Sequence, residues 1–82
     1  MDTLDSYAII TARHEAIGEI DILASREIPV REIIRNLFDA LSCEKKDLRG
    51  YYAKAERAQV LLAPGDTLKS KGVYDGDILR IL

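Results

Sequence analysis

Few of the residues that stabilise small domains through covalent bonds or metals occur in this sequence. Cys43 is the only cysteine, so the chain cannot form an internal disulfide, and a reducing compartment fits this composition best. His14 is the only histidine, and with one cysteine it cannot build a structural zinc site. A chain of 82 residues with neither a disulfide nor a zinc site depends on an efficient apolar core for its stability.

Signatures of catalysis are absent as well. The chain has no glycine-rich phosphate loop, and His14 stands in an expected turn, where a lone histidine is ordinarily exposed and solvated. Turn formation accounts for Asp75 and Asp77, which could otherwise suggest a cation site. Three serines have no general base at a recognisable spacing: Ser25, Ser42 and Ser70. We therefore expect no enzymatic activity, no cofactor, no metal and no small-molecule substrate.

The sequence indicates neither membrane insertion nor a signal peptide. No apolar run approaches the roughly 20 residues that a membrane span needs. Residues 1–6 are acidic and lack the apolar segment of a signal peptide. We expect them to be a flexible extension of a single domain covering residues 1–82. The formal net charge of −2 gives no general attraction to nucleic acid or anionic membranes. A cytoplasmic location follows from these absences.

The first third of the chain predicts a β-hairpin. Residues 7–13 are rich in β-forming side chains, and residues 14–18 supply a turn in which Gly18 can adopt a positive φ. A strict alternation follows, with Ile20, Ile22 and Ala24 on one side and Glu19, Asp21 and Leu23 on the other. A period of two is typical of a strand with one buried face, so the two segments should pair.

An amphipathic helix is the clearest element of the sequence. Its apolar stripe consists of Val30, Ile33, Ile34, Leu37, Phe38 and Leu41. Pro29 suits the first turn because its fixed φ is helical, and the predicted helix runs from about Pro29 to Ser42. Ile34 and Leu37 lie at the centre of the stripe and should be buried. Cys43 follows the stripe and is expected to be a small packing residue.

The remainder predicts three strands, over residues 51–56, 60–62 and 78–82. In the first of these, the alternation places Tyr51, Ala53 and Ala55 on one side. Leu68 and Val73 are isolated apolar anchors that should close one end of the core. A hairpin, one helix and three strands, joined by a right-handed crossover, predict an α+β fold. This is the ubiquitin-like β-grasp, a mixed sheet of four to five strands with one helix packed on one face.

Together these features resemble the YukD/EsaB family, small ubiquitin-like proteins of bacterial type VII secretion systems. The resemblance covers residues 7–82 and includes the hairpin glycine, the helix entry at 28–30, the apolar helix stripe, and the segments 61–62 and 75–79. It implies a non-catalytic cytosolic protein that supports assembly or regulation of the secretion apparatus. Its implied partners are protein components or regulators of that apparatus, which could recruit it to the inner face of the membrane.

The end of the sequence argues against covalent attachment. Ubiquitin-type modifiers and sulfur carriers need a flexible tail ending in two glycines, whereas this sequence stops at Ile81 and Leu82, within an expected strand. We therefore expect binding without conjugation or thiocarboxylate chemistry.

The outward face of the sheet is the main candidate for a binding surface. A β-grasp sheet has the strand order 2-1-5-3-4, which makes strands 1, 5 and 3 neighbours. The outward residues proposed for partner binding form an apolar and aromatic patch with basic side chains among it: Tyr7, Ile9, Tyr52, Lys54, Ile78 and Arg80. An equally weighted alternative is that these β-forming residues only stabilise the sheet.

A basic set of residues offers a second surface, comprising Lys45, Lys46, Arg49, Lys54 and Arg57. Its ordinary interpretation is a solvated face, followed by an acidic protein partner. RNA ranks last because Glu44, Asp47 and Glu56 are interleaved with the bases. The alternative function is a stand-alone β-grasp adaptor or RNA-associated module outside secretion.

Overall fold

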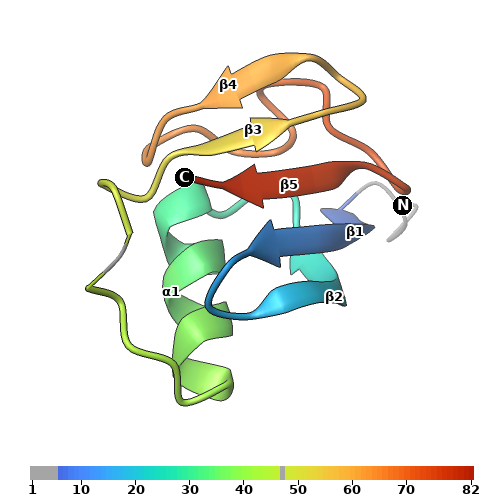
Figure 1. The fold of residues 1–82 in the computed structure, drawn as a ribbon. Coiled ribbons are helices and arrows are strands. Elements are labelled where there is room, and N and C mark those ends of the chain that lie inside the picture. The colour runs from blue at the N-terminus through green and yellow to red at the C-terminus, as the bar shows by residue number, and fades with distance from the viewer. Residues whose placement is uncertain (1–5, 47) are drawn as a thin grey trace.

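The computed structural model describes residues 6–46 and 48–82. Five strands and one helix follow in the order β1 (Tyr7–His14), β2 (Gly18–Ser25), α1 (Val30–Ala40), β3 (Ala53–Ala55), β4 (Val60–Leu62) and β5 (Ile78–Ile81). The strands form one sheet in the order β2-β1-β5-β3-β4, and α1 crosses one face of it (Figure 1). The predicted β-grasp fold and strand order are therefore confirmed. Of the expected N-terminal extension, residues 1–5 lie outside the described part.

The hairpin forms as predicted, with β1 one residue longer at its C-terminal end and β2 one residue longer at both ends. β1 and β2 pair antiparallel from Tyr7 opposite Ser25 to His14 opposite Gly18. Gly18 adopts a φ of 70°, which a residue without a side chain tolerates at little cost. The inward positions of β1 are buried while Ile9 is exposed, so the period of two places a single face of this hairpin in the core.

Helix α1 buries the predicted stripe, including Ile34 and Leu37. It ends at Ala40 rather than at Ser42. Leu41 caps the helix, and Ser42 has a φ of 54°, which is left-handed backbone that cannot continue a right-handed helix. Leu41 remains exposed, so the buried stripe stops at Phe38. Cys43 packs half-buried against the core, as expected.

Strand β3 is shorter than the predicted 51–56 segment. Tyr51 has a φ of 63° and follows Gly50, whose φ is 75°. Two successive left-handed residues turn the chain, and the strand begins only at Ala53. Tyr51 still packs partly against the core, but it does so from this turn and not through strand alternation. β3 nevertheless pairs with both β4 and β5, so the sheet order is unaffected.

The segment between β4 and β5 closes the end of the core. Leu68 and Val73 are fully buried there, as predicted. Arg26 is also buried. Its Nε donates to the Val73 carbonyl at 3.0 Å, and its guanidinium stacks on the Tyr74 ring with 4.2 Å to the centroid. Sequence reasoning missed this contact because it joins positions 47 residues apart.

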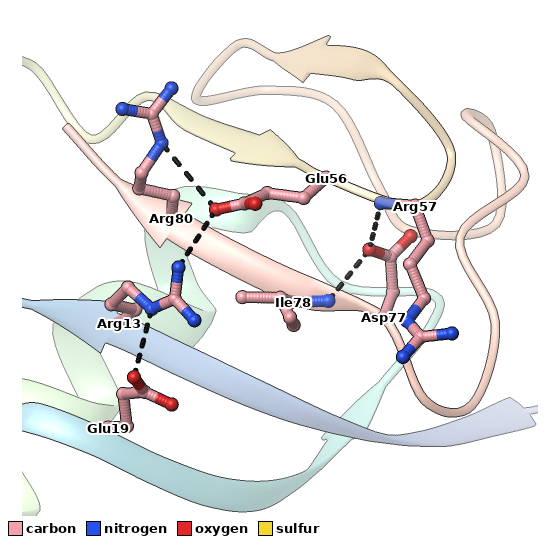
Figure 2. A network of polar contacts seen from close by, with 7 residues as sticks. All are labelled: Arg13, Glu19, Glu56, Arg57, Asp77, Ile78 and Arg80. Carbon is pink, nitrogen blue, oxygen red and sulfur yellow. Dashed lines mark hydrogen bonds and ion pairs between the residues drawn. The ribbon is translucent and has the colours of Figure 1, made fainter.

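Asp77 holds the start of β5 against the turn between β3 and β4. Its side chain is only 3% exposed. One carboxylate oxygen accepts from the Arg57 and Ile78 N–H groups at 2.8 and 2.7 Å, and the other accepts from Ala58 N–H at 3.1 Å (Figure 2). The aspartate therefore organises two segments, a larger role than the local turn that its sequence context predicted.

Candidate protein-binding face

The sheet has an open face on the side away from α1 (Figure 1). Strand alternation directs five of the six predicted binding residues toward it, and Tyr52 directly precedes β3 beside Leu82. Five are exposed, and Ile78 is half-buried. No helix or strand among residues 6–46 and 48–82 covers this face. These residues thus share one accessible surface, but they occupy different parts of it.

One end of the open face is apolar. Ile9 stands directly opposite Leu23 in the antiparallel register, and Tyr7 is the next outward residue of β1. Their exposed fractions are 58%, 69% and 49%, respectively. We call Tyr7, Ile9 and Leu23 the apolar end. Leu23 was not among the predicted binding residues, although the alternation of β2 had already placed it outward.

The middle of the open face is charged. A single row crosses all five strands, with Glu19, Arg13, Arg80, Lys54 and Leu61 paired in that order. This row separates the apolar end from Tyr52, which lies beyond it beside Leu82. Arg80 and Lys54 thus lie between Ile78 and Tyr52, so basic residues stand among apolar and aromatic ones as expected, while Tyr7 and Ile9 gather with Leu23 at one end. An apolar end and a basic centre lie side by side on the same face.

Arg13 is the residue of this row that sequence reasoning missed. Its Nε lies 3.3 Å from Glu19 Oε2, and its Nη1 lies 3.2 Å from Glu56 Oε1. The same Glu56 oxygen lies 3.7 Å from Arg80 Nε, so one carboxylate bridges two guanidinium groups (Figure 2). All four side chains are substantially exposed, and such ion pairs add little stability. Their effect is to orient Arg13 and Arg80.

Two hollows meet at Arg13 and Arg80. The larger, of about 870 Å³, is lined by Arg13, His14, Glu15, Lys46, Leu48, Arg49, Tyr52, Arg80, Ile81 and Leu82. The smaller, of about 660 Å³, is lined by Arg13, Lys54, Glu56, Gln59 and Arg80. Both are open depressions of the surface. The larger hollow joins side chains from the sheet with side chains from the loop after α1, whereas the smaller one is lined by strands β1, β3 and β5 and the turn after β3.

The second predicted surface divides in the structure. Lys46 and Arg49 line the larger hollow, and Lys54 lines the smaller one. Lys45 instead forms an ion pair with Asp39 near the end of α1. The side chain of Arg57 lines neither hollow. The basic loop and the sheet face, treated as separate surfaces from the sequence, are therefore partly one.

The remaining candidates for chemistry have structural roles. His14 is half-buried rather than exposed and solvated, because its ring packs edge-on against Phe38 with centroids 5.4 Å apart. Its Nδ1 accepts from the Ala16 N–H at 3.0 Å. Within the described residues, no group of three or more His, Cys, Asp or Glu side chains is placed to hold a metal ion. None of the described helices has the length and apolar character to cross a bilayer.

Comparison with known protein families identifies the family to which this chain belongs. The family model described as "WXG100 protein secretion system (Wss), protein YukD" matches residues 8–81. The chain belongs to the YukD family. The resemblance inferred from the sequence is thereby confirmed, and YukD membership makes the chain a ubiquitin-like protein associated with type VII secretion. No curated protein matches the chain.

A solved structure supports the fold assignment. The EccD5 ubiquitin-like domain from Mycobacterium xenopi is 17% identical to this chain and superposes with a TM-score of 0.58. The alignment covers 93% of this chain and 92% of that domain. At this identity the similarity establishes the ubiquitin-like fold, and it does not transfer contacts or partners.

Proposed function

We propose that this YukD-family chain is a non-catalytic accessory or regulatory protein of a bacterial type VII secretion system. It acts in the cytoplasm by binding protein components of the apparatus or its regulators, and such partners recruit it to the inner face of the membrane. The observation that carries this proposal is the match of residues 8–81 to a secretion-system family in a domain whose sheet has an open, partly apolar face.

The apolar end is the part of that face best suited to a protein partner. Single exposed apolar residues are ordinary, but Ile9 and Leu23 are cross-strand neighbours and Tyr7 adjoins them. Contiguous exposed apolar side chains are characteristic of interaction sites, and tyrosine is a frequent anchor residue in interfaces. Covering these three side chains would remove apolar area from water, which favours association.

The proposed binding is non-covalent. Leu82 is held on the sheet, where its N–H donates to the Tyr52 carbonyl at 3.0 Å and its carbonyl accepts from Arg49 N–H at 3.2 Å. Both bonds hold Leu82 against the segment from Arg49 to Tyr52. Immunoblots of the native host for covalent adducts of the chain test this point, and an isopeptide-linked species would contradict it.

Replacing Ile9 and Leu23 together with threonine should abolish support of secretion. Threonine keeps the β-preference of both positions while removing most of their apolar surface. Exposed substitutions change stability by about 0.5 kcal/mol or less, so the melting temperature should stay nearly unchanged. The measurement is complementation of a chromosomal deletion in the native host, with secreted substrate quantified by immunoblot at equal expression of each variant.

The control is Leu41→Thr, which replaces an exposed leucine at the end of α1, away from the open face. This variant should complement fully. Full complementation by the Ile9→Thr, Leu23→Thr double variant would remove the apolar end as the binding surface. Normal secretion in the deletion strain itself would overturn the proposed function. Ile78 is a less suitable test site because it is half-buried.

A further inference from the structure

We propose that the two hollows form one docking groove for an acidic, extended peptide segment of the protein partner. We call this surface the basic groove and define it by Arg13, Lys46, Arg49, Lys54 and Arg80. The inference rests on the proposed function insofar as the chain acts by binding protein, and it specifies the chemistry of what is bound. The apolar end lies beside the groove on the same open face.

The charge of the groove is opposite to that of the whole chain. Five cationic side chains line the two hollows, with the carboxylates of Glu15 and Glu56 among them. Two further carboxylates pair with these cations from the side, Glu19 with Arg13 and Glu44 with Lys46 at 3.2 Å. The formal net charge of the complete sequence is −2. Cations outnumber carboxylates at this surface, where β1, β3, β5 and the loop after α1 converge, although the whole chain is acidic. A local field of this kind attracts and orients an oppositely charged partner.

Several of these cations have donors available for a ligand. Within residues 6–46 and 48–82, Arg49 and Lys54 have no side-chain hydrogen bond or ion pair. Arg80 is engaged only through Nε, at 3.7 Å from Glu56, and Figure 2 shows its two terminal nitrogens directed away from the network. A guanidinium presenting both terminal nitrogens can bind a carboxylate with two parallel hydrogen bonds.

Arg13 is also positioned to bind a carboxylate of the peptide. Its guanidinium is held between Glu19 and Glu56 (Figure 2), and Arg13 lines both hollows. Its Nε is buried and lies near Glu19 without the alignment of a hydrogen bond, so this donor is not satisfied. Holding a long side chain in place before binding reduces the entropy that is lost when a ligand is ordered.

The shape of the groove favours an extended segment. Arg13, Arg80 and Lys54 stand on successive strands, which are about 5 Å apart. Tyr52, Leu48 and Leu82 add apolar surface on the loop side. An extended peptide presents alternate side chains to one face at intervals of about 7 Å. Carboxylates on that face can then contact several cations, and an intervening apolar residue can rest on Tyr52.

An acidic peptide fits this groove better than a nucleic acid does. Glu56 lies between Arg13 and Arg80. Glu19 is the β2 member of the charged row, and Asp21 lies next to it on the same side of β2. A nucleic acid carries an unbroken series of phosphates and binds best to a continuous basic surface. A peptide can place its few carboxylates beside the cations and neutral residues beside the acids.

The test uses the whole chain and a fluorescent decapeptide in which glutamate alternates with threonine, followed by fluorescence anisotropy at low salt. A matched peptide with glutamine in place of glutamate is the ligand control. The glutamate peptide should bind more tightly, and its affinity should fall as salt is added. Arg80→Gln and Arg49→Gln should each weaken its binding by about tenfold, the range of one charge-assisted hydrogen bond.

The matched protein control is Arg31→Gln, which removes one positive charge from the exposed side of α1, outside the groove. It should leave peptide binding within about twofold of the unchanged protein, since a distant surface charge is screened. Each variant must retain its melting temperature. Equal binding of the two peptides, absent binding of both, or unchanged binding by Arg80→Gln and Arg49→Gln would overturn the proposal.

An oligouridylate decamer is the third probe. Tighter binding of this RNA than of the glutamate peptide, with the same loss of binding in Arg80→Gln, would identify a nucleic-acid groove and overturn the proposal.

Complementation of the deletion strain separates the role of the groove from the proposed function. If the Arg49→Gln, Arg80→Gln double variant supports full secretion while Ile9→Thr, Leu23→Thr does not, the groove is refuted and the function stands. Secretion lost in both variants supports both.

Discussion

Replacing Phe38 with alanine should lower the free energy of unfolding by about 3–5 kcal/mol. Phe38 is fully buried and is the largest such side chain in the core. Its ring lies between the helix and the hairpin, where the His14 ring meets it edge-on at 5.4 Å. Removing it leaves a cavity that the rigid sheet cannot fill, in addition to the lost transfer free energy.

Such a loss is a large fraction of the roughly 5–15 kcal/mol that stabilises a small domain. Urea titration followed by far-ultraviolet circular dichroism measures it. The control is Leu41→Ala on the same helix end, where an exposed side chain should cost less than about 1 kcal/mol. A Phe38→Ala loss no greater than that of Leu41→Ala would contradict the placement of the helix on the sheet.

Replacing Asp77 with alanine should cost about 2–4 kcal/mol, although it removes only a carboxylate. The N–H groups of Arg57, Ala58 and Ile78 would all lose their acceptor. Hydrogen bonds to charged groups are individually strong, and a shielded donor without a partner carries a further penalty. Because Asp77 joins the turn after β3 to the start of β5, loss of the carboxylate should also loosen that turn.

Two variants separate this role from a general effect of charge. Asp77→Asn keeps one oxygen acceptor and should lose about half as much stability as Asp77→Ala. Asp75→Ala removes a neighbouring, exposed carboxylate that, among residues 6–46 and 48–82, accepts from Ile9 N–H alone, at 2.8 Å. It should cost about 1 kcal/mol. Thermal and urea unfolding give the comparison. Equal losses for Asp75→Ala and Asp77→Ala would refute the anchoring role of Asp77.

Elements with a long periodic pattern were predictable at close to residue resolution. The stripe around Ile34 and Leu37 located α1, and the alternation of residues 7–24 located the hairpin. In both elements the spacing of the apolar residues assigns each side chain to the buried or the exposed side. Several residues give the same assignment, which makes the prediction secure. The alternation of residues 51–56 overestimated β3, which has only three residues because the left-handed turn at Gly50 and Tyr51 delays its start to Ala53.

The candidate binding face was predictable in its members but not in its layout. Alternation correctly directed Ile9, Lys54 and Arg80 outward. It could not show that Arg80 stands between Arg13 and Lys54, because that order depends on the register of β5 with β1 and β3. Whether these residues bind a partner remains the subject of the proposals above.

By itself, the sequence determined most of the apolar residues that face the core, the order of the elements and the family of the chain. These properties depend on local periodicity and on patterns readable along the chain. Only the tertiary structure decided that Arg49, from the loop after α1, joins Arg13 and Arg80 in one groove, and that Asp77 anchors the turn after β3. Both features are contacts between segments that lie far apart in the sequence. Strand pairing and core packing set their geometry, so no local sequence pattern predicts them.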